Sequence, residues 1–345
     1  MENNSGNIQR NTSREWFAGI DSLRFVCALV VLLGHLKNPV FDALKHSENK
    51  ILKYSGFILG SSFVGIVAVI AFFVISGFVI HYPNKVKIKN LKVYYFRRFT
   101  RVLIPLIIIK VIGSWFGNPE NNVVWSLYCE LIYYTIYPIL CKVKTTWTTK
   151  VIAAYVIAFI VIAIGARNDI NSMIHQRDLN YNGNFAQLGF SFTWLVGLPF
   201  WLLGVRLAEN IDSLNEIISV HKIWFLRLSI YLLSVICLVL RFHFFVPYTL
   251  SMVLISFQVA LWVEAEIRYY KTKRPIVFFE NMGKFSYSLY FCHPLIITVL
   301  IALTPLNNYT YLVYVLLTIT CAYLFYLSCE RPSHILAKKL ELIKL

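Results

Sequence analysis

Charged residues are scarce in this sequence, at 14% of 345 residues. A soluble domain carries roughly a quarter charged residues, so the composition excludes an ordinary soluble globular protein. Hydrophobic residues make up 58% of the sequence and aromatic residues 16%. The apolar residues also occur in blocks of about 20, the length that crosses a bilayer as a helix. The sequence therefore predicts an all-α, polytopic integral membrane protein.

Acidic residues are few as well, with 17 Asp and Glu against 33 Lys and Arg and a formal net charge of +16. In a membrane protein Lys and Arg collect on the cytoplasmic side, so the charge does not indicate a nucleic-acid partner. The seven cysteines lie in apolar segments and form no Cys-x-x-Cys pair. Neither a disulfide framework nor a metal site is expected. A signal-peptide cleavage site is also lacking, so we expect the first apolar run to be retained.

Ten apolar segments are candidate membrane spans, and an even number places both termini on one side. The segment around Lys110 is the weakest, because it is short and contains a charge. The candidates are 17–38, 56–82, 102–116, 123–141, 151–166, 186–207, 222–241, 248–267, 283–303 and 310–329.

The connections between these segments differ in charge. If the N-terminus is cytoplasmic, the inner connections and tails hold 22 Lys and Arg and the outer connections hold seven. The positive-inside rule then predicts that both termini are cytoplasmic. We expect a multi-pass protein of the inner (cytoplasmic) membrane, with cytoplasmic tails at 1–15 and 333–345 around a membrane domain at 16–332.

The first apolar segment, "IDSLRFVCALVVLLGHL", contains Asp21, Arg24 and His35. Arg24 and His35 are 11 residues apart, so on a helix they share a face within about 20° and lie about 16 Å apart along the axis. Taken alone, Arg24 could be a structural residue whose side chain extends to the lipid headgroups. Taken alone, His35 could be a hydrogen-bonded histidine at the membrane interface without a catalytic role. Together with Asp21 they suggest a polar stripe that lines a cavity.

Further polar groups lie inside other predicted spans. Glu130 in "WSLYCELIYY" needs a partner in the membrane, and Lys110 and Arg24 are both candidates. Ser76 in "FFVISGF" is followed by Gly77, a pair that equally well indicates close helix packing.

The ninth predicted span and the basic stretch before the third also carry polar residues. "GKFSYSLYFCHPLI" places Tyr287, Tyr290 and His293 at i, i+3 and i+6, followed by Pro294, which should disturb the helix. "KVKIKNLKVYYFRRFTRVLIP" carries three arginines at the start of the third span. They are either membrane anchors or a bidentate site for a polyanion such as a nucleotide phosphate. The three are Arg97, Arg98 and Arg101.

Six motifs, in this order, resemble the acyltransferase-3 family of integral membrane proteins. They are "IDSLRFVCALVVLLGH", "FFVISGF", "RRFTRVLIP", "WSLYCE", "GKFSYSLYFCHP" and "ERP", and they cover most of residues 20–332. Only 19 residues, 106–124, separate the third motif from the fourth. This is fewer than in many relatives, so we expect a reduced third span.

The resemblance implies transfer of an acyl group, commonly acetyl from acetyl-CoA, to a hydroxyl of a surface polysaccharide, lipopolysaccharide or lipid-linked glycan. It also implies that His35 and Arg24 are catalytic, and that the arginines of the basic motif face the CoA. A sugar hydroxyl needs a base, for which neutral histidine is suited, and a thioester needs no metal. Oxyanion donors are also required. Glu130 is a third catalytic candidate, and the candidates for substrate or oxyanion contacts are Ser76, Trp125, Tyr287, Tyr290 and His293.

Two alternatives remain open at this point. A transporter or flippase of lipid-linked sugars would also have many spans and a polar stripe. Such proteins are often built from repeated halves, and the motif clusters here do not repeat, which favours the enzyme. Within the family, the acceptor could also be a lipid or a small molecule.

Overall fold

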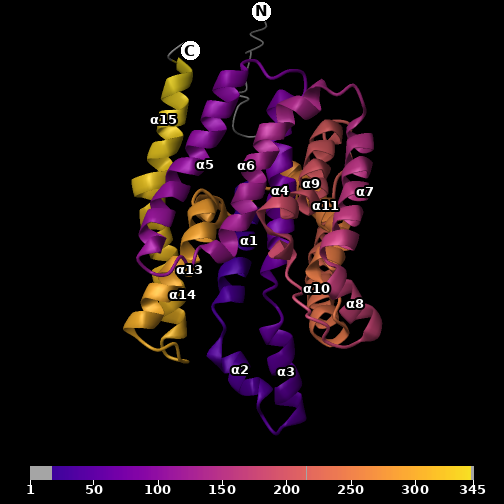
Figure 1. The fold of residues 1–345 in the computed structure, drawn as a ribbon. Helices are drawn as coiled ribbons and strands as arrows, with labels where there is room; N and C mark the ends of the chain where they lie inside the picture. The colour runs from indigo at the N-terminus through magenta and orange to yellow at the C-terminus, as the bar shows by residue number, and fades with distance from the viewer. Residues whose placement is uncertain (1–17, 215, 343–345) are drawn as a thin grey trace, which may run out of the picture.

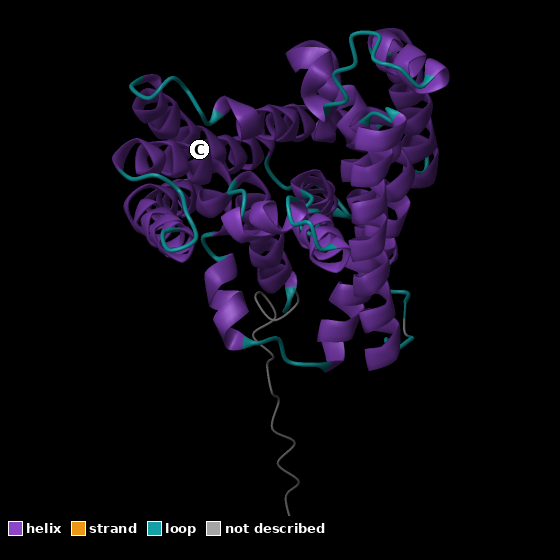
Figure 2. Cartoon of the chain, turned by 90° about the horizontal axis from the view of Figure 1, so that it is seen from below, coloured by secondary structure: helices purple, strands orange, loops and turns teal. Residues whose placement is uncertain are grey.

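The fold is a bundle of helices, most of them running along one common direction (Figure 1). The computed structural model describes residues 18–214 and 216–342, and every regular element in these residues is a helix (Figure 2). The all-α prediction is therefore confirmed. The expected tail at 1–15 lies outside the described residues.

The elements follow one another with short connections. In chain order they are α1 (Ile20–His35), α2 (Pro39–Lys45), α3 (Lys50–Gly60), α4 (Gly65–His81), η2 (Tyr82–Asn84), α5 (Leu91–Ser114), α6 (Asn121–Lys142), α7 (Trp147–Gly165), α8 (Arg167–His175), η3 (Phe185–Leu188), α9 (Gly189–Asn210), α10 (Val220–Phe244), α11 (Tyr248–Thr272), α12 (Val277–Gly283), α13 (Ser286–Leu303), α14 (Tyr311–Phe325), the π-helical η4 (Tyr326–Glu330) and α15 (Arg331–Leu342).

Eight helical stretches in the described residues are long and apolar enough to cross a membrane. They are Lys50–Asn84, Asn121–Lys142, Trp147–Gly165, Phe185–Asn210, Val220–Phe244, Tyr248–Thr272, Ser286–Leu303 and Tyr311–Lys339. Each overlaps one of the ten predicted segments.

The other two predicted segments also form helices, α1 and α5, but they differ from typical spans. Helix α1 has only 16 residues, and α5 carries the basic motif inside the helix rather than ahead of it. Because α5 begins at Leu91, it has 24 residues and is much longer than the predicted segment 102–116.

The C-terminal helix is also longer than predicted. Helices α14, η4 and α15 follow one another without a break, so the predicted boundary at 332/333 falls inside a helix. Helix α15 packs alongside α5, as Figure 1 shows at the left of the bundle. The part of the predicted C-terminal tail that is described, up to residue 342, is therefore helical.

Helix α1 lies in the middle of the bundle and packs against α4, α12 and α13 (Figure 1). Glu280 of α12 caps its first turn, since one carboxylate oxygen accepts hydrogen bonds from the backbone N–H groups of Gly19 at 2.8 Å and Ser22 at 3.1 Å. A carboxylate at this end also complements the helix dipole. At Gly283 of α12, an added Cβ would lie 2.0 Å from the carbonyl oxygen of Asp21. The two helices therefore require glycine at this contact, which fixes the rotation of α1.

Helices α4 and α9 also approach through glycine. A Cβ on Gly77 would lie 2.0 Å from the carbonyl oxygen of Trp201, and a Cβ on Gly204 would lie 1.9 Å from that of Val74. Small residues let membrane helices come this close. The packing role suggested for Gly77 is confirmed.

Pro294 lies inside its helix and does not end it. Helix α13 continues from Ser286 to Leu303 with Pro294 inside it. Proline removes only its own N–H from the helix ladder, and membrane helices tolerate this loss when neighbouring groups compensate.

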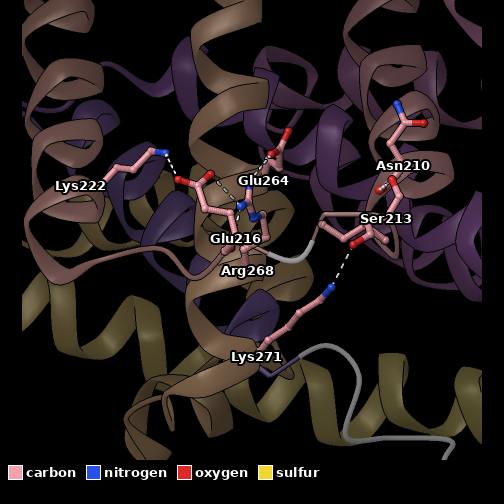
Figure 3. Close-up of polar contacts among 8 residues, drawn as sticks. Asn210, Ser213, Glu216, Lys222, Glu264, Arg268 and Lys271 are labelled. Carbon is pink, nitrogen blue, oxygen red and sulfur yellow. Dashed lines mark hydrogen bonds and ion pairs between the residues drawn. The ribbon is translucent and has the colours of Figure 1, made fainter.

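A polar cluster joins the α9–α10 connection to the end of α11 (Figure 3). Arg268 donates to the Glu264 carboxylate at 2.9 Å, to the Glu216 carboxylate at 3.1 Å and to the Glu216 carbonyl at 2.6 Å. Lys271 donates to the carbonyl of Ile211 at 2.9 Å. The hydrogen bond from Arg268 lowers the pKa of the Glu216 carboxyl. These contacts hold the connection against the bundle.

Candidate active site

A cavity of about 330 Å³ lies between α1, α4, α5, α6, α13 and the continuous C-terminal helix. Seven of the eleven predicted site residues contribute to its wall, although they come from five different helices. The seven are Arg24, Ser76, Arg98, Arg101, Glu130, Tyr287 and Tyr290. The polar residues found inside separate spans therefore face one shared space.

One end of the cavity is rich in positive charge. Arg24 of α1, which is 3.5 Å from the Asp21 carboxylate, meets Arg98 and Arg101 of α5 in the wall. Arg97 is exposed and does not contribute to the wall. Of the three predicted arginines in the basic motif, the structure thus brings Arg98 and Arg101, which are three residues apart, to the cavity.

Glu130 is held by hydroxyl groups. Its carboxylate accepts a hydrogen bond from Ser76 at 2.5 Å and another from Tyr134, one turn further along α6. Trp201 of α9 donates its indole N–H to the Ser76 oxygen at 3.2 Å. Lys110, one of the suggested partners, is 3.0 Å from Glu120 instead. Hydroxyl donors, not a salt bridge to Lys110, therefore satisfy this carboxylate within the bundle.

Tyr290 and Ser126 form the part of the cavity wall that lies near His293. Their hydroxyl oxygens are 2.8 Å apart, and both residues are buried in the wall. The Tyr290 ring is 6.3 Å, between centroids, from the ring of His293, one turn further along α13. The cavity therefore extends from the arginines to the neighbourhood of a histidine.

His293 is paired with His35. His35 Nδ1 lies 2.6 Å from His293 Nε2, and the stacked rings are 4.9 Å apart between centroids. His293 is fully buried, whereas His35 is exposed on its other side. The sequence named both residues but did not predict that they meet.

The hydrogen bonds assign the protons of the neutral pair. His293 Nδ1 lies 3.1 Å from the carbonyl oxygen of Leu289, which only accepts, so this nitrogen carries a proton. His293 Nε2 then accepts from His35 Nδ1–H. The remaining nitrogen, His35 Nε2, keeps its lone pair and is the nitrogen that can take a proton.

Trp125 also lies outside the cavity wall, as Arg97, His35 and His293 do. Its ring packs against Phe73 at 6.5 Å and Phe185 at 5.4 Å between centroids. The structure therefore places Trp125 in an aromatic cluster beside the cavity.

A family model described as an acyltransferase domain matches residues 17–327. The chain belongs to the acyltransferase-3 family. No curated protein and no solved structure matches it. The matched range contains all eleven predicted site residues, and the family membership together with the eight apolar helices identifies a membrane acyltransferase.

The C-terminal helix of the acyltransferase contributes three polar wall residues that were not among the predicted site residues. Tyr326, Glu330 and His334 follow one another at i, i+4 and i+8, and all three face the cavity from the C-terminal helix. The last predicted span ended at 329, so Glu330 was noted only as part of the "ERP" motif, and His334 fell in the predicted tail at 333–345. Their helical spacing was the available signal, because residues four apart share one face of a helix.

Proposed function

We propose that this acyltransferase moves an acyl group, with acetyl as the first candidate, from acyl-CoA to a hydroxyl of a cell-surface or lipid-linked carbohydrate. One observation carries the proposal. A single cavity has Arg98 and Arg101 in its wall at one end and Tyr290 at the other, next to the His35–His293 pair.

The arginine end suits an anionic donor. Guanidinium groups bind phosphate with two parallel hydrogen bonds, and Arg98 and Arg101 both face the cavity. The cavity volume of about 330 Å³ is at the lower limit of small-molecule sites. It therefore fits the narrow arm of a CoA thioester, with the nucleotide remaining at the arginine end.

The histidine pair supplies a base for the acceptor. His35 Nε2 removes the proton from the sugar hydroxyl as the oxygen attacks the thioester carbonyl carbon. The new C–O bond forms, the C–S bond breaks, and the CoA thiolate takes up a proton to leave as the thiol. Tyr290 and Ser126 are the nearest hydroxyl groups that can donate to the developing oxyanion.

The charge distribution supports an orientation for this reaction. With both termini cytoplasmic, and with α1 and α5 crossing the membrane beside the eight apolar stretches, the arginine end faces the cytosol, where acyl-CoA is made. His35, at the other end of α1, then faces the outer side of the inner membrane. The donor enters from one side and the acceptor meets the base from the other.

Transfer of label from acetyl-CoA tests the proposal. Membrane vesicles from cells that lack the native gene are supplied with labelled acetyl-CoA, and acetate is then released from their glycans by mild alkali. Vesicles that contain the protein should yield alkali-labile label, and those that contain His35→Ala should not. Equal label with and without the protein would refute the proposed function.

A further inference from the structure

The cavity wall contains a buried carboxylate whose role is not explained by the proposed reaction. Glu330 is fully buried, and its Oε2 atom accepts hydrogen bonds from the backbone N–H of Ser288 at 3.2 Å and from the Ser288 hydroxyl. Its Oε1 atom has no hydrogen-bond partner among the described residues. The nearest basic atom, His334 Nε2, is 3.5 Å away without hydrogen-bond geometry. One half of the carboxylate is therefore fixed and the other half is unused.

A second unused polar atom lies in the same wall. The Tyr287 hydroxyl oxygen is buried and has no hydrogen-bond partner among the described residues. Buried polar atoms in native proteins nearly always have a partner, so atoms of this kind in a cavity point to a ligand. Here the wall offers an acceptor at Glu330 and a hydroxyl donor at Tyr287.

The surrounding charges restrict the ligand group. Arg101 and Arg24 are the cationic neighbours of Glu330. The Glu330 carboxylate repels phosphate, so the part of the wall next to it is unsuited to the nucleotide end of a donor. It instead accepts hydrogen bonds from an uncharged group that carries N–H or O–H.

A local irregularity places Glu330 in this position. It is the last residue of the π-helical turn Tyr326–Glu330, between α14 and α15. π-helical turns occur mostly as single turns within α-helices and are frequent at functional sites. Tyr326, Glu330 and His334 all face the cavity from this helix.

We propose that Glu330 and Tyr287 form a subsite for the amide-bearing arm of the donor, the pantetheine part of acyl-CoA. The arm's N–H groups donate to Glu330 Oε1, and an amide carbonyl accepts from the Tyr287 hydroxyl. Tyr287 and Tyr290 are three residues apart, about 4.5 Å along the axis of α13. An arm bound at Tyr287 therefore leads its thioester toward Tyr290. The inference rests on the proposed function.

Two variants separate this contact from a structural role. Glu330→Gln is isosteric, and its amide oxygen can still accept from Ser288, while its NH₂ group replaces the free acceptor with a donor. Tyr287→Phe removes a hydroxyl that has no partner in the described protein, so no hydrogen bond of the fold is lost. Tyr155→Phe is the matched control, because its hydroxyl bonds to Ser256 at 2.6 Å outside the cavity.

The experiment measures equilibrium binding of three probes to the full-length protein in lipid nanodiscs. The probes are CoA, pantetheine alone, and adenosine 3′,5′-bisphosphate, which lacks the arm. Glu330→Gln should raise the Kd for CoA and pantetheine by about ten- to a hundredfold, and Tyr287→Phe should raise it by up to about tenfold. Neither variant should change the Kd for the bisphosphate. Arg98→Ala with Arg101→Ala should raise the Kd for the bisphosphate and for CoA and leave the Kd for pantetheine unchanged.

The outcomes distinguish the two proposals. Wild-type protein that binds neither CoA nor pantetheine would refute the proposed function. Wild-type protein that binds CoA, with Tyr287→Phe and Glu330→Gln binding pantetheine equally well, would refute the subsite alone. An equal loss of bisphosphate and pantetheine binding would also refute it, because the variants would then act on the whole cavity. If Glu330→Gln does not fold, Tyr287→Phe decides the question.

Discussion

The histidine pair gives the sharpest quantitative test of the site. His35→Ala removes the proposed base and should slow acyl transfer by about 10²–10⁴. His293→Phe keeps a ring against His35 but removes the acceptor for its Nδ1–H, which is 2.6 Å away in the structure. A neutral hydrogen bond contributes about 0.5–1.5 kcal/mol, so this variant should slow transfer by up to about tenfold.

Combining the substitutions tests whether His293 acts through His35. If it only positions the base, the double variant should be no slower than His35→Ala alone, because residues that act as a unit are not additive. His293→Gln, which restores an acceptor, should recover most of the loss. The assay is the initial rate of label transfer from acetyl-CoA in membrane vesicles, normalised to protein abundance. Multiplicative losses in the double variant, or a larger loss from His293→Phe than from His35→Ala, would refute the assignment.

Four further predictions test the topology, the site and the packing. Val86→Cys, at a fully exposed position, should resist an impermeant thiol reagent on intact cells whose native cysteines are unreactive, and labelling from outside would overturn the orientation. Arg24→Lys should abolish acyl transfer, because lysine lacks the planar guanidinium group. Normal acyl transfer by this variant would show that Arg24 only anchors the helix. Gly77→Ala should lower the free energy of unfolding by about 1–3 kcal/mol, because the added methyl group meets the backbone of α9. Thermal or denaturant unfolding measures this change, and an unchanged stability would contradict the contact. The Glu216–Arg268 pair should stabilise the protein above the ordinary Glu pKa of 4.5 and lose that effect as the pH falls through the lowered pKa. The difference in unfolding midpoint between wild type and Glu216→Gln should therefore shrink on acidification, and a difference independent of pH would argue against it.

Hydropathy predicted most of the fold, and it did so because apolar length is a property of local sequence. Eight of the ten segments coincide with helices that meet the criteria for a span. The errors occur at helix boundaries that are determined by tertiary packing. Helix α5 extends back through the basic motif, and α15 extends the chain's last helix beyond α14. These two extensions, α5 and α15, pack against each other. Neither extension is visible in hydropathy, since both carry charge.

The site was predictable in composition but not in pairing. Residue types and helical faces singled out Arg24, Glu130 and Tyr290, and the structure places all three in the wall of one cavity. Spacing within a span cannot show which residue of another span lies opposite, so the pairing of His35 with His293 had to come from the structure. For the same reason the sequence suggested Lys110 and Arg24 as partners of Glu130, whereas in the structure the hydroxyl groups of Ser76 and Tyr134 donate hydrogen bonds to it.

The first helix keeps ionisable residues because it is surrounded by protein and separates two different cavities. Asp21 and Arg24 face the polar cavity, whereas Val26 and Val30, on the far side of α1, border an apolar cavity of about 480 Å³. Charges that face a polar space and each other avoid most of the cost of transfer into hydrocarbon. The cap from Glu280 and the glycine contact at Gly283 fix the rotation of α1. A turn of about 100°, the angle of one residue, would point Arg24 away from the cavity. The function of α1 therefore depends on α12 as much as on its own polar residues.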